Sequence, residues 1–97
     1  MGISKKISIA IILILMAQDV SAAEDRVQDL QCLAKNIYFE GRNQPWVGQL
    51  AIAQVTLNRV KSAAFPATIC QVVKQQRKEI CQFSWYCDGK SDKPKNI

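Results

Sequence analysis

The alternation of hydrophobic and polar positions predicts an apolar leader followed by a short helical domain. Residues 7–17 form a nearly unbroken apolar run, preceded by two lysines and followed by Val20-Ser21-Ala22. This is the layout of a secretory signal, and the run is shorter than the roughly 20 apolar residues that a membrane span needs. We therefore expect residues 1–22 to be a signal peptide and 23–97 to be the exported domain. An uncleaved membrane anchor or a buried core helix is the alternative.

Beyond the leader, apolar residues recur at helical spacing in three segments. In the first, residues 24 to about 40, acidic side chains lie near the start, where they suit the helix dipole, and Gly41 follows as a C-terminal stop. The second runs from about Pro45 to Lys61, with proline in its first turn. The third, capped by Thr68, runs from Ile69 to about Gln76. The apolar face of the first helix is expected to consist of Leu30, Leu33, Ala34 and Ile37.

The remainder of the chain shows less regular patterning. Residues 75–79 are polar and predict a loop, and residues 81–87 are dense in aromatic side chains between two cysteines. The tail, residues 88–97, has almost nothing to bury. With no internal repeat and three helical segments, the sequence predicts one mainly α domain.

The cysteines predict disulfides. All four, Cys32, Cys70, Cys81 and Cys87, follow the leader, and a small exported domain commonly needs such cross-links for stability. Four cysteines allow three pairings. Our preference is Cys70 with Cys81, which bracket a single loop, and Cys32 with Cys87. A structural zinc site is the weaker alternative, because the chain has no histidine and no closely spaced Cys-x-x-Cys pairs.

Charge and composition exclude several classes of function. The net charge of the whole chain is +5, which suits an anionic partner such as a bacterial wall, although solubility alone would explain it. The basic residues are scattered and belong to no recognisable binding module, so we expect no nucleic acid partner. Without histidine, serine and cysteine nucleophiles lack their usual base, and the few glycines form no phosphate-binding loop. We expect no cofactor and no metal.

Glu40 is the candidate catalytic acid. It lies near the end of the first predicted helix, directly after Ile37, Tyr38 and Phe39. Apolar neighbours and the negative end of the helix dipole both disfavour an ionised carboxylate, which would make Glu40 a proton donor near neutral pH. Cleavage of a glycosidic bond needs such a donor for the leaving oxygen. The alternative is an ordinary solvated glutamate paired with Arg42.

The aromatic segment is the second candidate. Rings such as those of Phe83, Trp85 and Tyr86 can stack on sugar faces, while Gln82 and Ser84 offer hydrogen bonds to hydroxyl and amide groups. The alternative is a disulfide-bounded loop whose rings fill a small core.

Four segments in order resemble the SleB-type cell wall hydrolases, which include spore-cortex-lytic enzymes and similar exported or phage-borne proteins. They are LAKNIYFEGRNQP (33–45), GQLAIAQVTLNRV (48–60), FPATICQVV (65–73) and CQFSW (81–85). The resemblance covers about residues 30–92. It implies a partial lysozyme-like, lytic transglycosylase-like fold with Glu40 as the acid. Substrate contacts are then expected from Asn58, Gln82, Phe83, Ser84 and Trp85.

The resemblance also implies the reaction. The family cuts peptidoglycan between N-acetylmuramic acid and N-acetylglucosamine, by a route in which the muramic 6-hydroxyl closes a 1,6-anhydro ring. A single convincing carboxylate suits this route, whereas an ordinary hydrolase uses two. Asp88 is a possible second carboxylate, but it lies outside the four segments. A secreted or periplasmic monomer that acts on bacterial peptidoglycan, without stable membrane insertion, is expected.

Two departures from the family pattern qualify this expectation. Gly41 stands where the family usually has alanine. The family's domains also continue beyond the Gln-Phe-Ser-Trp segment with further helices and a motif of Gly, Ala, His and Tyr, whereas this sequence ends at Ile97 without histidine. We therefore expect the C-terminal part of the domain, and with it the cleft wall opposite Glu40, to be missing. The chain alone should then show little activity. The alternatives are a non-enzymatic wall-binding or inhibitory module, and a small disulfide-stapled protein without glycan contact.

Overall fold

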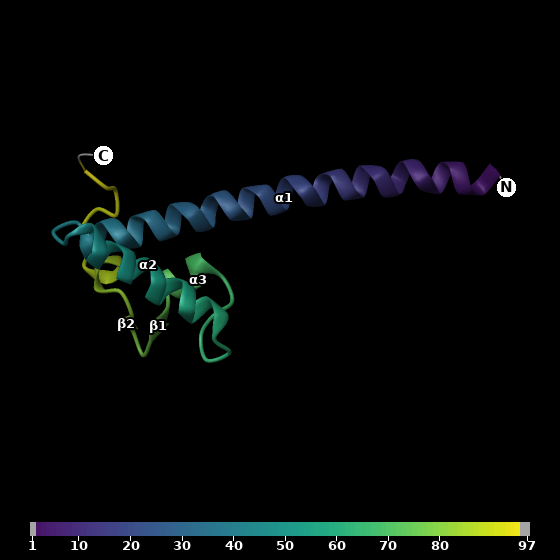
Figure 1. Ribbon diagram of the computed structural model, residues 1–97. Coiled ribbons are helices and arrows are strands. Elements are labelled where there is room, and N and C mark those ends of the chain that lie inside the picture. Colours follow the sequence, from purple (N-terminus) through teal and green to yellow (C-terminus); the bar gives the residue numbers. More distant parts are fainter. Residues whose placement is uncertain (1, 96–97) are drawn as a thin grey trace.

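The protein is mainly helical, as predicted and in keeping with a partial lysozyme-like domain. A computed structural model describes the backbone of residues 2–95 and the side chains of residues 20–95. Two long helices and a short one are followed by a small hairpin and a 3-10 turn (Figure 1). The elements are α1 (Gly2–Gly41), α2 (Trp46–Lys61), α3 (Ile69–Val73), β1 (Gln76–Arg77), β2 (Ile80–Cys81) and η1 (Ser84–Cys87).

Helix α1 begins much earlier than the predicted helix of residues 24–40. No glycine or proline lies between residues 3 and 40, so nothing in the sequence interrupts the helix before Gly41. Its N-terminal half extends away from the other elements (Figure 1). The side chains of residues 1–19 lie outside the described residues, so the signal peptide at 1–22 stays a prediction. Within the described part of the chain, none of the helices combines the length and apolar character needed to cross a membrane.

Helices α1 and α2 meet closely where α1 ends. Gly41 is buried, and a Cβ atom there would lie 2.6 Å from Cδ1 of Ile52 on α2. The side-chain amide of Gln49 donates a hydrogen bond to the carbonyl oxygen of Gly41 at 3.2 Å. The predicted stop at Gly41 is confirmed, and α2 begins one residue after Pro45.

The buried face of α1 differs from the predicted apolar face. Leu30 is 64% exposed and Ala34 is also exposed, so this part of the prediction was wrong. The face that packs on the domain instead contains Cys32, Asn36 and Phe39, which share one side of a helix at i, i+4 and i+7. Asn36 is fully buried, because partners on other elements satisfy its amide. Leu33 and Ile37 are half-buried, so hydrophobicity alone locates only part of the buried face of α1.

The core lies where α3 and η1 pack against α1 and α2. Thr68 caps α3 as predicted, with its hydroxyl accepting a hydrogen bond from the Gln71 N–H at 3.2 Å. Asp29 of α1 also accepts a bond from the Cys70 N–H at 3.1 Å, which ties α3 to α1. The buried residues are Val72, Val73, Phe83 and Trp85, surrounded by Cys32, Phe39, Val60, Phe65, Ile69 and Tyr86.

A two-stranded hairpin replaces the loop predicted for residues 75–79 and shortens the third helix. Strands β1 and β2 are antiparallel, with Arg77 opposite Ile80. Lys78 and Glu79 form the turn with φ of 51° and 69°, the left-handed conformation at both central positions that suits the twist of a two-residue hairpin. Because the chain reverses here, α3 ends at Val73 and not near Gln76.

Two disulfides are present, as predicted, but the preferred pairing was wrong. Cys32 pairs with Cys70, and Cys81 pairs with Cys87. Helix α3 packs along α1, which places the Cα atoms of Cys32 and Cys70 5.2 Å apart, a separation that a disulfide spans readily. The second bond closes the short loop that contains η1. The sequence preference ignored this contact between α1 and α3.

Candidate functional site

Glu40 lines a cavity of about 330 Å³ at the C-terminal end of α1. The cavity is formed by three parts of the chain: the last turn of α1 with Arg42, the first residues of η1, and the C-terminal tail. Glu40 therefore shares one hollow with two residues of the predicted aromatic segment, Ser84 and Trp85. Its lining residues are Tyr38, Phe39, Glu40, Arg42, Ser84, Trp85, Asp88, Lys90, Ser91, Lys93 and Lys95.

The carboxylate of Glu40 is more open than the sequence suggested. The side chain is exposed, so the expected enclosure by apolar neighbours was wrong. Phe39 turns toward the core, where its ring stacks on Trp85 with the ring centroids 4.7 Å apart and the planes 18° from parallel. Successive helix residues lie about 100° apart, so burial of Phe39 leaves Glu40 at the rim. Glu40 is thus positioned to meet a ligand that enters from solvent.

Trp85 forms a fixed wall of the cavity. It is 7% exposed, and its indole N–H donates a hydrogen bond to Oδ1 of Asn36 at 2.9 Å. The amide of Asn36 donates in turn to Oγ1 of Thr56 at 3.1 Å, and that hydroxyl donates to the carbonyl oxygen of Ile52 at 3.0 Å. A satisfied buried polar chain of this kind holds its members in one geometry. The orientation of Trp85 is therefore set by both long helices.

The C-terminal tail supplies another wall, although the sequence predicted a solvated tail. The hydroxyl of Tyr38 donates to the carbonyl oxygen of Lys95 at 2.8 Å and accepts from the Lys95 N–H at 2.9 Å. Arg42 also donates to this hydroxyl, at 3.2 Å. The backbone hydrogen bond from Lys95, followed by the one from Arg42, lowers the pKa of Tyr38 from its ordinary value of 10.0. These contacts hold the tail, and with it Asp88, beside Glu40.

Three predicted substrate-contact residues do not line the Glu40 cavity. Gln82 is exposed outside it. Phe83 is buried in the core, where the guanidinium of Arg59 lies 5.2 Å from the centre of its ring. Asn58 is exposed and accepts a hydrogen bond from the amide of Gln54 at 2.9 Å. The burial of Phe83 agrees with the core-filling alternative.

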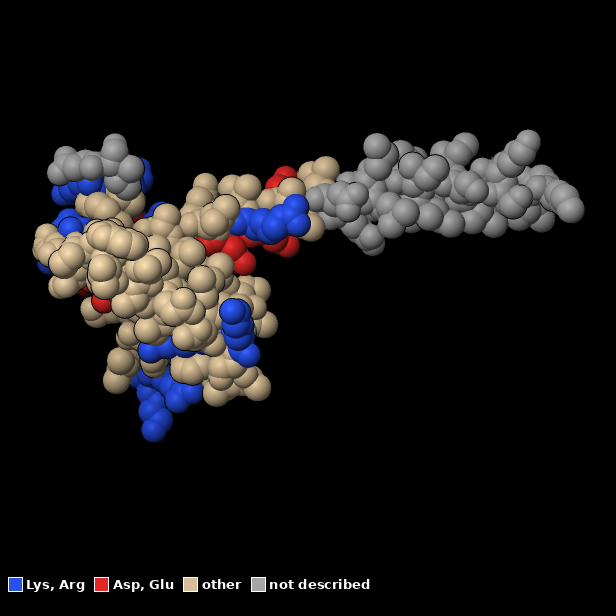
Figure 2. Space-filling view, in the orientation of Figure 1, with Lys and Arg blue, Asp and Glu red and all other residues tan. Residues whose placement is uncertain are grey.

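Sequence reasoning missed the residues that shape the site indirectly. Asn36 and Thr56 carried no local signal, because each is a single polar residue on a helix and its partner lies far away in the sequence. The tail contacts join positions 57 residues apart and had no local signal. On the face shown in Figure 2, lysine and arginine side chains lie in several separate groups, in keeping with the scattered basic residues of the sequence.

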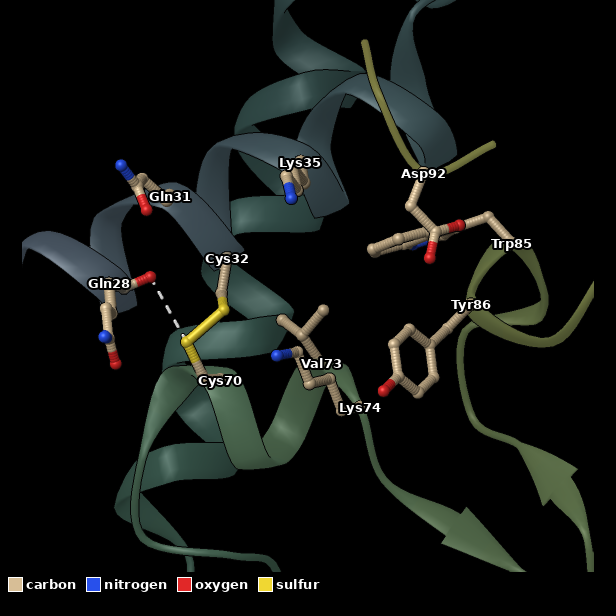
Figure 3. A pocket seen from close by; sticks show the side chains of 10 residues that line it. All are labelled: Gln28, Gln31, Cys32, Lys35, Cys70, Val73, Lys74, Trp85, Tyr86 and Asp92. Carbon is tan, nitrogen blue, oxygen red and sulfur yellow. Dashed lines mark hydrogen bonds between the residues drawn. A yellow bond between two sulfur atoms is a disulfide. The ribbon is translucent and has the colours of Figure 1, made fainter. Parts of the chain in front are cut away.

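A second cavity, of about 380 Å³, lies between α1, α3 and η1. Trp85 lines this cavity as well as the Glu40 cavity, so one buried indole is a shared wall of both. Figure 3 shows Lys35 and Lys74 at this second cavity, together with Tyr86, Asp92 and the Cys32–Cys70 disulfide. Among the described residues, no group of three or more His, Cys, Asp or Glu side chains forms a metal site.

The sequence matches the model of a known protein family. The profile of the Cell Wall Hydrolase family matches residues 43–97, more than half of the sequence. The chain belongs to this family of cell wall hydrolases. The matched segment includes α2, α3, η1 and the tail, and Glu40 precedes it by one short turn. The resemblance seen in the sequence is therefore confirmed at the level of the family.

Curated relatives carry the name spore cortex-lytic enzyme. The protein from Bacillus cereus is 47% identical over 49 residues, which cover 50% of this chain and 19% of the relative. The one from Oceanobacillus iheyensis is 45% identical over 49 residues, covering 50% and 18%. The one from Bacillus subtilis is 44% identical over 45 residues, covering 46% and 15%. The matched segment thus spans less than a fifth of the length of these relatives. No solved structure matches the chain.

Proposed function

We propose that this domain cleaves peptidoglycan glycan strands between N-acetylmuramic acid and N-acetylglucosamine, with Glu40 as the acid. Membership of the cell wall hydrolase family and the names of the curated relatives support the substrate class. The observation that carries the proposal is the position of Glu40, at the end of α1 and in one cavity with the fixed ring of Trp85. A rigid wall beside a carboxyl group would hold a bound sugar in one position relative to the proposed acid.

The proposed reaction is that of a lytic transglycosylase. Glu40 donates its proton to the oxygen that leaves with N-acetylglucosamine as the glycosidic bond breaks. The carboxylate that remains accepts the proton of the muramic 6-hydroxyl, whose oxygen bonds to the anomeric carbon and closes the 1,6-anhydro ring. One carboxyl group suffices, because it acts first as acid and then as base.

Asp88 supports the competing route of hydrolysis. It lines the same cavity as Glu40, which the sequence alone did not indicate. Glycosidases that use water employ two carboxyl groups, one as acid and one as base or nucleophile. The product distinguishes the two routes, since transglycosylation leaves a 1,6-anhydro end and hydrolysis leaves a free reducing end.

The test is cleavage of purified peptidoglycan by a chain extended at its C-terminus with the corresponding remainder of a spore cortex-lytic relative. Glu40→Gln should lower the rate by about 10²–10⁴-fold, the usual contribution of positioned proton transfer. Glu79→Gln is the matched control, because Glu79 is an exposed glutamate in the hairpin turn, away from the cavity. Retention of most activity by Glu40→Gln would show that another group is the acid.

A pelleting assay with purified walls separates the enzyme from a binding module. The chain as given and its Glu40→Gln variant should bind walls equally, since the substitution changes one carboxyl group at an open rim. Wall binding together with an extended chain that never cleaves, whatever stands at position 40, would favour the non-enzymatic module.

A further inference from the structure

The second cavity has the character of a built site. Its wall includes the Cys32–Cys70 disulfide and the buried side chains of Val73 and Trp85, which are 1% and 7% exposed. The disulfide fixes α3 to α1 on one side, and the hydrogen bond to Asn36 fixes the indole on the other. A ligand would therefore meet a preformed surface, which lowers the entropic cost of binding.

The polar groups around this cavity are of complementary kinds. Two ammonium groups, from Lys35 and Lys74, and one carboxylate, from Asp92, line it and leave an excess of positive charge. Gln28 and Gln31 add side-chain amides on the α1 side. Sγ of Cys70 lies 3.2 Å from the carbonyl oxygen of Gln28, and Figure 3 draws no contact from either ammonium group to another residue shown there. Both lysine side chains are exposed, so their ammonium groups are accessible to an anion in the cavity.

We propose that this cavity binds the carboxylate-bearing stem peptide of the glycan strand. Lys35 and Lys74 pair with the carboxylates of the peptide. Asp92 accepts hydrogen bonds from peptide N–H groups, and the side-chain amides of the two glutamines can both donate and accept. The inference rests on the proposed function in one respect: it takes the peptide as the side branch of the sugar held at Glu40. A short acidic peptide carries both carboxylates and amide groups, which are the groups that these lining side chains can bind.

Trp85 explains how one substrate would use both cavities. Its indole lines both the Glu40 cavity and the lysine-lined cavity, so a muramic residue held in one cavity can direct its peptide to the other. Tyr86 extends this wall, with its ring edge-on to that of Trp85 at 5.9 Å between centroids. The arrangement would favour strands that carry peptides over bare strands.

Binding can be measured without glycan cleavage. The probe is a soluble N-acetylmuramyl peptide with free carboxylates, titrated into the 15N-labelled full chain, with the same peptide amidated at its carboxylates as the control. The free-acid peptide should perturb the amides of Gln28, Lys74 and Tyr86, and its affinity should fall as salt rises. The amidated peptide should bind more weakly.

Charge variants provide the decisive comparison. The Lys35→Gln/Lys74→Gln variant should weaken binding of the free-acid peptide by about three- to tenfold, the scale expected for two exposed ion pairs. Lys61→Gln/Lys78→Gln makes the same change of charge on exposed residues outside this cavity and should leave affinity unchanged. Asp92→Asn should tighten binding, a gain that misfolding would not produce.

The outcomes separate this proposal from the proposed function. Equal binding of both peptides, no effect of the lysine pair, or perturbation confined to the Glu40 cavity would overturn it. Absence of binding would overturn it as well. If the peptide binds here while the extended chain cleaves no glycan, the peptide site stands and the proposed glycosidase does not.

Discussion

The indole N–H of Trp85 donates a hydrogen bond of 2.9 Å to Asn36, which is fully buried in the face of α1 that packs on the domain. The side-chain amide of Asn36 donates a second hydrogen bond, of 3.1 Å, to the hydroxyl of Thr56 on α2. Hydrogen bonds therefore link η1, α1 and α2 through buried polar side chains. Both cavities depend on the position of this indole. The geometry of the candidate site thus rests on Asn36, a side chain that lines neither cavity.

Replacement of Asn36 by alanine should destabilise the fold by about 2–3 kcal/mol. The indole N–H would lose its acceptor and a small cavity would remain, and an unsatisfied buried donor alone costs about 1–3 kcal/mol. Urea unfolding measures the loss. In a Trp46→Phe background, the emission of Trp85 should shift to longer wavelength as the ring becomes hydrated.

Asn58→Ala is the control for this prediction. Asn58 is exposed and pairs only with the neighbouring Gln54 on α2, so its loss should stay within about 0.5 kcal/mol. Equal stability of the Asn36 and Asn58 variants would show that the buried chain contributes little.

The parts of the fold that could be predicted from sequence are those set by local chemistry. Helical spacing and Pro45 placed α2 within one residue, Gly41 marked the end of α1, and Thr68 marked the start of α3. The number of disulfides followed from an even set of cysteines. The motif around Glu40 and the aromatic segment led to the correct family.

The remainder depended on contacts between distant residues. Asn36 is buried because its partners lie 20 and 49 positions away, which no helical periodicity can reveal. The tail folds beside Glu40 because Tyr38 bonds to Lys95, 57 positions away. The hairpin turn at Lys78 and Glu79 lacks the glycine or asparagine that usually signals a left-handed conformation. Tertiary partners decide such positions.

Removal of the two disulfides should have unequal effects. The chain-entropy relation gives about 4 kcal/mol for the Cys32–Cys70 bond, with its separation of 38 residues, and about 2 kcal/mol for Cys81–Cys87, with its separation of 6. Paired Cys→Ser variants compared by thermal unfolding measure the difference. Peptide mapping of the non-reduced protein should recover these two pairs, and recovery of Cys70 joined to Cys81 would contradict the structure.

Tyr38 should titrate below the ordinary tyrosine pKa of 10.0. The backbone bond from Lys95 and the bond from Arg42 lower its pKa below 10.0. Phenolate absorbance on alkaline titration should show an early component that Tyr38→Phe removes and that Arg42→Gln moves to higher pH. Because the pKa of Tyr38 is lower in the folded state than in the unfolded state, ionisation of Tyr38 stabilises the fold only at high pH. This stabilisation is fully present above the ordinary tyrosine pKa and is lost as the pH falls through the lowered pKa. Thermal stability at neutral pH should therefore not depend on this ionisation.

The exported form should begin at Ala23 or Glu24. Two lysines, an apolar run and Val20-Ser21-Ala22 form the signal that a peptidase removes. N-terminal sequencing of the protein recovered outside the cytoplasm checks this. An Ala22→Arg variant, which places a bulky charge at the cleavage position, should accumulate as the longer form. A membrane-integral product that still starts at Met1 would refute the signal peptide.

Asp88→Asn should leave most of the glycan cleavage of the extended chain intact. Although Asp88 lines the Glu40 cavity, its Oδ1 atom accepts a hydrogen bond from the Lys90 N–H at 2.8 Å, which shapes the turn at the start of the tail. Asparagine can accept the same bond, so the turn should survive the substitution. Under the transglycosylase route the rate should stay within about tenfold of wild type, since Glu40 alone moves the protons.

Asp88→Ala, which removes the acceptor, should loosen the tail and weaken the Tyr38 titration effect without changing the product. Mass spectrometry of the released fragments should show 1,6-anhydro ends for both variants. A loss of about 10²-fold or more in Asp88→Asn, together with free reducing ends in the wild-type digest, would instead make Asp88 the second carboxylate of a hydrolase.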